Sequence, residues 1–239
     1  MASVGIHYYS DFIPETLVRL VKKQTVKCLL DLGCGDGAIL FALKQRGLLK
    51  NKKVFAADIA PQRILKVQKI DRDFRCFVID ACQLDKVMRP KSVDLVISSQ
   101  VIEHVPDQEE FIRQVGRVLK PEGSFYLSTV FKKRYAWYFY KNDKGKWVLD
   151  PTHLREYRHD KELVPFLEKS GFKIIYHQKT LWQFPITDFF LKRLGFGSDI
   201  YQRSRLLRAL RIVKLPILGY YCWELVSQKR MGKANETKD

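Results

Sequence analysis

A short apolar run that ends in three alternating glycines most constrains what this chain can fold into. Residues 29–37 read Leu-Leu-Asp-Leu-Gly-Cys-Gly-Asp-Gly. Glycine adopts positive φ without strain and lets other groups approach the backbone closely. A helical pattern follows over 38–43, and the free N–H groups of a helix start favour an anionic group. The pattern predicts a strand, a tight turn and a helix around a small charged ligand, with the Asp31 carboxylate at the strand's end.

Strand and helix patterns alternate along most of the chain. We expect strands over 28–32, 53–57, 74–79, 93–98, 124–130, 173–179 and 220–227, and helices over 15–23, 38–46 and 161–169. Alternation of this kind predicts an α/β fold. The expected form is a doubly wound, mostly parallel, seven-stranded Rossmann-like sheet with helices on both faces and an antiparallel last strand.

The carboxyl ends of the strands form the ligand-binding edge of such a sheet. The glycine turn, Asp58 and Asp80 each follow an expected strand, so we expect these three segments to meet at that edge. Asp107 precedes a further amphipathic helix, where it is expected to be the N-cap, with Glu110 completing a capping box.

The length of 239 residues fits a single domain. Residues 24–130 are expected to form its cofactor-binding half. Two segments interrupt the alternation, 131–158 with interleaved aromatic and basic residues and 181–218 with a basic amphipathic helix around 203–214. We expect both to cap a substrate pocket. The apolar stripe of that helix is expected to face the core, with membrane binding as the alternative, and the polar tail 231–239 to be disordered.

The net charge of +17 favours an anionic partner, such as nucleic acid, an acidic membrane or a phosphorylated substrate, although a merely solvated basic surface is the simpler alternative. No run approaches the roughly 18 apolar residues of a membrane-spanning helix. The five cysteines lack the paired spacing of a zinc site and are expected to be free thiols in a reducing compartment. With no signal-peptide pattern at the N-terminus, we expect a cytoplasmic protein, peripheral at a membrane if the basic helix binds lipid.

The ligand at the glycine turn is expected to contain a ribose, because a carboxylate such as Asp58 at the end of the second strand accepts hydrogen bonds from ribose hydroxyls. A nicotinamide dinucleotide and an adenosyl ligand fit this equally well. The turn itself, residues 33–37, departs from the Gly-x-Gly-x-x-Gly fingerprint of dinucleotide sites. Asp36 beside it would repel a pyrophosphate, which disfavours the dinucleotide.

Five more segments follow the turn in order. They read Ala-Asp-Ile-Ala-Pro (57–61), Ile-Asp-Ala-Cys-Gln-Leu (79–84), Val-Asp-Leu-Val-Ile-Ser (93–98), Val-Ile-Glu-His-Val-Pro-Asp (101–107) and Val-Leu-Lys-Pro-Glu-Gly (118–123). Together with residues 31–37, in this order and spacing over roughly 25–130, they resemble the class I S-adenosylmethionine-dependent methyltransferases. The resemblance implies S-adenosylmethionine as the cofactor.

The resemblance also implies roles for individual residues. The methionine part would be lined by the turn glycines, with backbone contacts from Ser98 and with Asp31 near the ammonium group. Asp58 would bind the ribose hydroxyls. The adenine ring would pack on Ile59, its amino group would donate to Asp80, and a ring nitrogen would accept from the Ala81 N–H. The glycines concerned are Gly33, Gly35 and Gly37, whereas Cys34 is expected to be a packing residue.

Methyl transfer needs a base only when the acceptor atom holds a proton, as a hydroxyl does. The candidates are His104, directly after the fourth strand, and His153 in the first capping segment. Some members of the family bind a divalent ion through Glu-x-x-Glu-His. Here Gln100 replaces the first glutamate of that motif, so we expect no metal.

The expected function is therefore methyl transfer from S-adenosylmethionine to a small or lipid-linked acceptor, at oxygen. RNA methylation is an alternative suggested by the net charge. A non-catalytic cofactor-binding scaffold protein is an alternative from another class.

Overall fold

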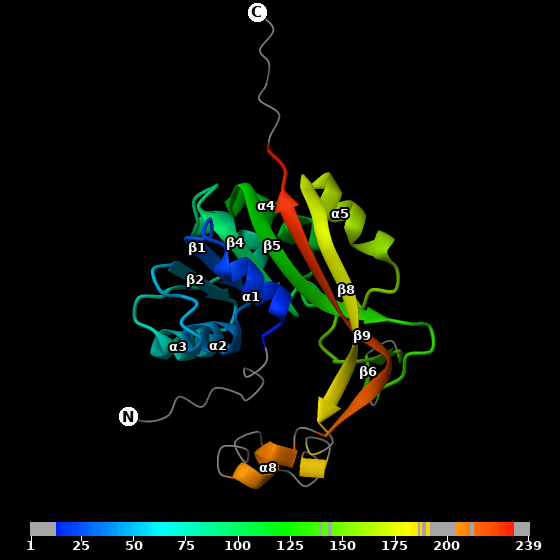
Figure 1. Ribbon diagram of the computed structural model, residues 1–239. Coiled ribbons are helices and arrows are strands. Elements are labelled where there is room, and N and C mark those ends of the chain that lie inside the picture. Colours follow the sequence, from blue (N-terminus) through cyan, green and yellow to red (C-terminus); the bar gives the residue numbers. More distant parts are fainter. Residues whose placement is uncertain are drawn as a thin grey trace, which may run out of the picture.

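A computed structural model describes residues 13–138, 140–142, 145–185, 187, 190–191, 204–210 and 213–231. Its centre is a seven-stranded sheet with the order β3-β2-β1-β4-β5-β9-β8 (Figure 1). The strands are β1 (Cys28–Leu32), β2 (Lys53–Asp58), β3 (Arg75–Val78), β4 (Val93–Ser99), β5 (Leu119–Lys132), β8 (Phe172–Pro185) and β9 (Lys214–Lys229). The first five run parallel, and β9 is antiparallel to both β5 and β8. The expected fold class is confirmed.

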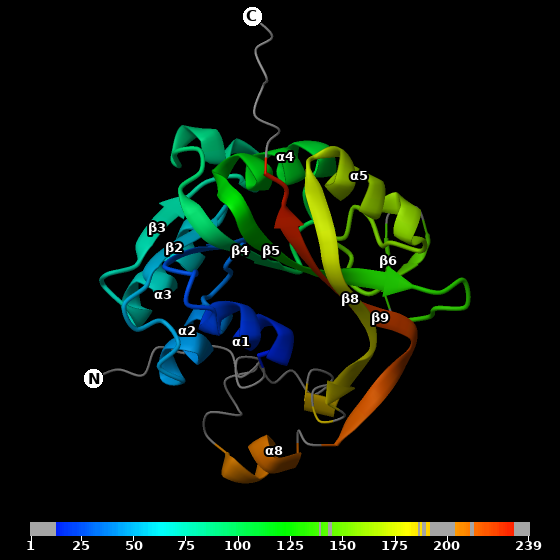
Figure 2. The ribbon, with the colours of Figure 1, turned by 45° about the horizontal axis from the view of Figure 1, so that its top comes forward.

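Helices cover both faces of the sheet. On one face, α1 (Glu15–Lys22), α2 (Ala38–Gln45) and α3 (Pro61–Ile70) enclose one apolar cluster. On the other face, α4 (Gln108–Val118), α5 (Val164–Lys169) and the 3₁₀ helix Ala81–Lys86 enclose a second. Figures 1 and 2 show the two layers with the sheet between them.

Continuous apolar runs form the inner strands because neighbouring residues must serve opposite clusters. In β1, Leu29 packs on the α1 face and Leu30 on the α4 face, and both are fully buried. In β2, Val54 and Phe55 divide in the same way. Successive side chains of a strand point to opposite faces of the sheet, and here helices cover both faces. Neither face of these strands therefore meets solvent, so neither carries polar residues in alternation.

Two local expectations need correction. Asp107 caps α4 by accepting from the N–H groups of Glu109 and Glu110, each at 3.0 Å. The Glu110 carboxylate, however, binds Arg113 and Gln114 and does not complete a capping box. The helix expected over 161–169 is split into a 3₁₀ turn (Asp160–Glu162) and α5. The break precedes Pro165, which has no backbone N–H to continue the hydrogen-bonding pattern.

The hairpin of β8 and β9 is longer than expected. Pairing continues through Gln183↔Pro216 to Pro185↔Lys214, so both ends of the segment 181–218 are strand. This two-stranded ribbon leads away from the sheet to α8 (Arg205–Leu210) (Figures 1 and 2).

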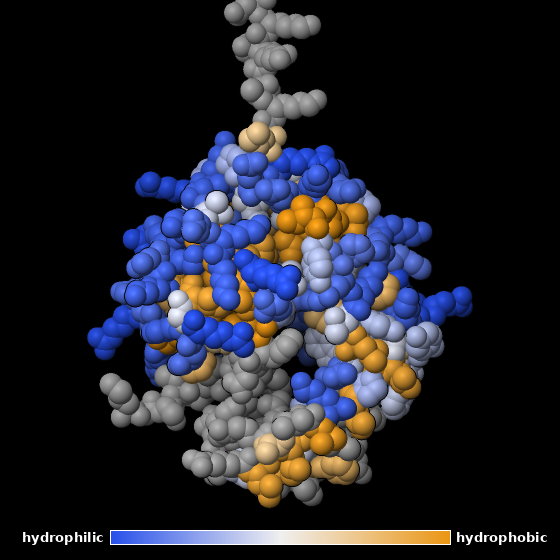
Figure 3. Space-filling view, viewed as in Figure 1, coloured by the Kyte–Doolittle hydropathy of each residue, from blue (hydrophilic) through white to orange (hydrophobic). Residues whose placement is uncertain are grey.

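The apolar stripe of the basic helix does not face the core, contrary to expectation. Leu206 is 70% exposed, and Leu210 and Val213 are exposed as well. The ribbon holds this helix away from the sheet, and Figure 3 shows apolar side chains at this end of the molecule.

The first capping segment contains a short antiparallel pair, β6 (Tyr140–Lys141) and β7 (Trp147–Val148). Whether either segment caps a substrate pocket stays a prediction. Of the tail expected to be disordered, 232–239 lies outside the described residues. None of the described helices is long and apolar enough to span a membrane.

Candidate functional site

The glycine turn is built as expected from the sequence. Gly33, Gly35 and Gly37 have φ values of 72°, 55° and 82°. The N–H groups of Gly33 and Cys34 both donate to the carbonyl of Ala57, at 2.7 and 3.0 Å, which fixes the turn against β2. A Cβ added to Gly33 would lie 2.3 Å from a methyl group of the Val101 side chain. The turn therefore requires glycine for both conformation and space.

Asp58 connects the ends of three strands. Its carboxylate accepts from the Gly35 N–H and the Ala60 N–H, both at 2.9 Å, and its carbonyl accepts from the Ile79 N–H at 3.0 Å. The Arg63 guanidinium lies 3.7 Å from the carboxylate. The segments after β1, β2 and β3 thus meet at one edge of the sheet.

Two buried polar atoms at this edge have no hydrogen-bond partner within the described residues, Asp31 Oδ2 and Ser98 Oγ. Asp31 is only 1% exposed. Burial, followed by the negative charge of Asp58, raises the pKa of Asp31 to about 7. Because buried polar groups are almost always paired, these atoms mark a place where a polar or cationic ligand would be stabilised.

The other expected cofactor residues lie at the ends of β2 and β3. The Ile59 side chain is 69% exposed, which is unusual for an apolar residue beside a buried carboxylate. Asp80 caps the 3₁₀ helix by accepting from the Cys82 N–H at 2.8 Å, and Ala81 is the first residue of that helix. Burial raises the pKa of Cys34, so a packing role fits this residue better than a nucleophilic one. The binding roles of these residues stay predictions.

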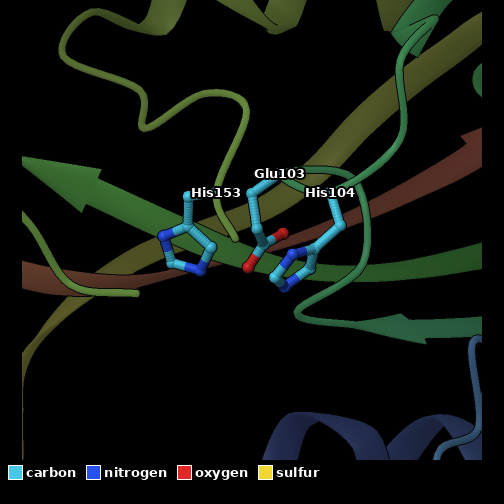
Figure 4. A group of neighbouring side chains, drawn as sticks. All are labelled: Glu103, His104 and His153. Atoms are coloured by element: carbon cyan, nitrogen blue, oxygen red, sulfur yellow. The ribbon is translucent and has the colours of Figure 1, made fainter. Parts of the chain in front are cut away.

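The two candidate bases lie together although they are 49 positions apart in the sequence. The ring centroids of His104 and His153 are 4.9 Å apart, edge to face. Glu103 points its carboxylate between them (Figure 4). One ligand atom from each of these three residues lies within 4.8 Å of the others. Glu103 and His153 are buried, whereas His104 is partly exposed.

Arg155 brings the two loops together. Its Nη1 donates to the carbonyls of Ile102 and Val105 at 2.7 and 2.6 Å, and its Nη2 donates to Pro106 at 2.8 Å. The Leu154 N–H donates to the Glu103 carbonyl at 2.9 Å. The guanidinium, with its fork of five donors, therefore fixes the loop after β4 to the loop that carries His153.

Glu156 orients His153 from the opposite side. Its buried carboxylate accepts from His153 Nδ1 at 2.8 Å, Lys132 Nζ at 2.6 Å and the Leu149 N–H at 2.7 Å. Burial opposes the ionisation of Glu156, but the hydrogen bonds from His153 and Lys132 outweigh it and hold its pKa below the usual value. Because Nδ1 is the donor to Glu156, the free nitrogen of neutral His153 is Nε2.

Glu103 and His104 are shifted towards their neutral forms. Burial raises the pKa of Glu103 to about 7, while Thr129 donates to one of its oxygens at 2.9 Å. The other oxygen has no hydrogen-bond partner within the described part of the chain. Burial, and then His153, lower the pKa of His104. A neutral imidazole near neutral pH is able to accept a proton.

The same three side chains could hold a metal ion, since two imidazoles and a carboxylate suit ions such as Zn²⁺. Sequence reasoning considered Glu103 and His104 for this role, but not together with His153. The expectation that no metal binds here stays a prediction. Glu156 and Lys132 were missed as parts of this site. Arg155 stands in a His-x-Arg-x-Tyr run (153–157) that is similar to a loop-fixing stretch of the resembling family, and the loop contacts of Arg155 agree with that reading. No local signal in the sequence points to Lys132.

Comparison with known proteins identifies the family of the chain. A family model described as a methyltransferase domain matches residues 6–177. A ubiquinone biosynthesis O-methyltransferase of Idiomarina loihiensis is 30% identical over 118 residues, 46% of this chain and 45% of that protein. A probable S-adenosylmethionine-dependent methyltransferase of Mycobacterium tuberculosis is 32% identical over 157 residues, 64% of this chain and 52% of that protein.

Solved structures agree on the fold. One of them is the phosphoethanolamine N-methyltransferase 2 of Haemonchus contortus in complex with S-adenosyl-L-methionine. It matches this chain with a TM-score of 0.58 and 16% sequence identity. The match covers 90% of this chain and 51% of that chain. The chain thus spans about half the length of the curated relatives that it matches.

Proposed function

The chain belongs to the class I S-adenosylmethionine-dependent methyltransferase family, and on that premise we propose that it methylates a small or lipid-linked acceptor at oxygen, with S-adenosylmethionine as the methyl donor.

The observation that carries the proposal is the edge formed by the glycine turn, Asp58 and Asp31. The unpartnered Asp31 Oδ2 and the open glycine turn fit a cationic ligand with a flexible amino-acid portion. In this proposal Asp58 binds the ribose, and Ile59, which is exposed, packs against the flat adenine ring. The cofactor supplies an activated methyl group on a positively charged sulfur, so the protein's task is to bind, orient and exclude water.

A hydroxyl acceptor must lose its proton as the new bond to carbon forms. His153 Nε2 and the imidazole of His104 are the proposed proton acceptors, because Glu156 binds Nδ1 of His153 and the lowered pKa of His104 keeps its imidazole neutral, with a free lone pair, near neutral pH. In this step the acceptor oxygen gains the methyl carbon, the carbon–sulfur bond breaks, and the proton moves to an imidazole. The O-methyltransferase name of one relative supports oxygen as the acceptor atom.

Calorimetry with S-adenosylhomocysteine tests the cofactor site. Asp58→Ala should weaken binding at least about tenfold, because a carboxylate with two ribose hydrogen bonds contributes roughly 1.5–3 kcal/mol. Asp73→Ala, at an exposed aspartate after α3, is the matched control and should bind normally. Equal affinity of Asp58→Ala and wild type would remove Asp58 from the site.

The acceptor class is tested with labelled S-adenosylmethionine and fractions of a host extract. We expect label in small molecules or lipids, and His153→Ala should lower incorporation at least about a hundredfold if this imidazole accepts the proton. Label confined to protein would contradict the proposed acceptor class.

RNA methylation is the second candidate, favoured by one observation on the first capping segment. Trp137 and Trp147 are partly exposed with ring centroids 5.7 Å apart, and Lys141 Nζ lies 4.5 Å from the centroid of Trp147. Exposed aromatics beside cations suit stacked bases. Label confined to RNA would favour this candidate, whereas cofactor binding without any label transfer would favour a non-catalytic scaffold.

A further inference from the structure

A cavity separate from the edge described above lies between α1 and the β8–β9 hairpin. Its volume is about 640 Å³, within the usual range for small-molecule sites. Figure 1 shows why it exists, since α1 covers the middle of the sheet and no other helix among the described residues covers the adjoining face of β8 and β9. Its walls are mostly apolar, with Leu20, Ile175, Tyr176 and Val226 among them.

One buried carboxylate belongs to the lining of this cavity. Glu224 is 4% exposed and accepts hydrogen bonds from the Tyr126 hydroxyl and from Gln178 Nε2. Within the described residues no lysine or arginine forms an ion pair with it. An ionised carboxylate can accept about four hydrogen bonds, so Glu224 retains acceptor capacity. A buried carboxylate without a cation is costly unless further donors satisfy it.

The two cations of the cavity lining lie on its α1 wall. Arg19 and Lys23 are exposed, and Arg19 is paired with Glu15 at 3.5 Å. An anionic head group would meet the unpaired charge of Glu224 inside the cavity. A neutral hydroxyl or amino group would instead supply the hydrogen that the carboxylate lacks.

Gln100 lies between the lining of the cavity and the sheet edge formed by the glycine turn, Asp31 and Asp58. This residue follows β4 directly and has a φ of 57°, an unusual conformation for a side chain of its kind. Its Nε2 lies 3.4 Å from Ser128 Oγ and 3.9 Å from Cys222 Sγ, and Cys222 lines the cavity. Ser128 is the register partner of Glu224. Gln100 and Ser128 thus link the lining of the cavity to the end of β4, where Ser98 lies.

We propose that this cavity binds a predominantly apolar molecule that carries a hydroxyl or amino group, with that group donating a hydrogen bond to Glu224. The role of this molecule as the methyl acceptor rests on the proposed function. In this proposal the apolar walls hold the body of the molecule, and the methyl donor approaches from the side of Gln100, which contacts Cys222 of the lining.

Binding is tested with 2-naphthol, a fluorescent apolar probe with one hydroxyl group. We expect saturable binding to the wild-type protein. The probes 2-methylnaphthalene, which lacks the donor, and 2-naphthoate, which is anionic, should bind at least about fivefold more weakly. Absence of 2-naphthol binding, or equal binding of all three probes, would overturn the proposal.

Three variants locate the probe. Thr180→Trp fills the cavity from an exposed position on β8 and should abolish 2-naphthol binding. His177→Trp places the same side chain at another exposed position on β8 that does not line the cavity, so it is the matched control and should bind normally. Glu224→Gln keeps the shape but loses the charge, and should weaken 2-naphthol about fivefold. Unchanged binding in Thr180→Trp would place the probe elsewhere and refute the site.

The acceptor role is tested separately. Thr180→Trp should bind S-adenosylhomocysteine like the wild type but lose label transfer to the extract fraction, while His177→Trp keeps both. Full transfer by Thr180→Trp would refute the acceptor role. If the wild-type protein does not bind S-adenosylhomocysteine, the proposed function is refuted. The result with 2-naphthol would still test the cavity as a binding site.

Discussion

The Asp31 side chain is buried, and one of its oxygens has no hydrogen-bond partner among the residues that the structure describes. Its place at the end of an interior strand accounts for the burial. In the folded protein its pKa is about 7, above the ordinary value of 3.8, because burial and Asp58 disfavour the charged form. The folded state therefore holds this proton more tightly than the unfolded state. The corresponding stability is complete below about pH 4 and is lost as the pH rises from about 4 to 7.

Ligand binding should show the opposite pH dependence. If the Asp31 carboxylate binds the ammonium group of S-adenosylhomocysteine, affinity should rise by up to about tenfold between pH 6 and 7.5 as the carboxyl group ionises. Calorimetry across this range measures the effect. Asp31→Asn should bind more weakly and show little pH dependence, and a variant with the full wild-type pH profile would exclude Asp31 as its source.

Glu156 offers a second prediction, because its carboxylate is the anionic partner of buried Lys132. Glu156→Gln leaves the Lys132 ammonium, 8% exposed, without a counter-charge. We expect a loss of about 3–5 kcal/mol in the free energy of unfolding, measured by urea denaturation. Glu168→Gln, at an exposed position of α5, should change it by less than about 0.5 kcal/mol.

A second substitution separates charge from shape. Lys132→Met in the Glu156→Gln background removes the unpaired cation and should restore part of the lost stability. No recovery would mean that the loss came from the other contacts of Glu156.

The meeting of the glycine turn, Asp58 and the segment after β3 at one edge could be predicted because each stands at a strand end, a position that the local pattern reveals; their binding roles stay predictions. The partners of Arg155 and Glu156 could not be predicted, because they lie in the loop after β4 and in β5, and no local pattern specifies such a pairing. His153 was named from the sequence, but its contact with His104 depends on Arg155.

At the scale of elements, two turns depend on glycine to different degrees. Gly33, in the turn after β1, has both positive φ and Val101 against it, whereas Gly47, in the turn after α2, has a φ of 67° and open space around its Cβ position. Gly47→Ala should cost about 1 kcal/mol in unfolding free energy, from conformation alone. Gly33→Ala should cost about 2 kcal/mol more because the new methyl group overlaps Val101.

Urea denaturation of both variants measures the difference. Val101→Ala in the Gly33→Ala background should recover much of the excess cost. Equal losses in the two single variants would show that the Val101 contact relaxes freely.

The central strands could be predicted closely because both of their faces are buried, and the apolar run therefore ends where the strand ends. The hairpin of β8 and β9 was underestimated. Beyond Leu181 it is a ribbon outside the core, where cross-strand pairing continues without the apolar pattern that sequence reasoning detects. The same ribbon explains why the stripe on α8 was wrongly expected to face the core.

At the scale of the whole molecule, the net charge of +17 and the exposed end of the ribbon point to the same test. Leu206, Leu210 and Leu218 are exposed there, in a segment rich in arginine. Membrane association stays a prediction. If the protein binds membranes, we expect it to bind vesicles of phosphatidylserine and phosphatidylcholine, and we expect salt to weaken this binding. Vesicles of phosphatidylcholine alone should bind little protein.

The double variant Leu206→Ser, Leu210→Ser should bind such vesicles at least about tenfold more weakly, because burial of each leucine contributes roughly 1.5 kcal/mol or more. Leu65→Ser combined with Leu154→Ser removes two exposed leucines elsewhere and is the matched control. Equal flotation of the two double variants would exclude the ribbon end as the membrane contact. The nature of the anionic partner could not be predicted, because charge alone does not identify one.

The position of β9 has a consequence for how the protein is made. This strand is the last of the sheet in sequence, yet it lies between β5 and β8 and is the link that holds β8 in place. On the ribosome, β1 to β5 can assemble early, but the edge of β5 stays open until residue 229 has left the exit tunnel. A translation stop before residue 214 would therefore release a chain with two strands missing from its sheet and a bare β5 edge, a ready substrate for chaperones and aggregation.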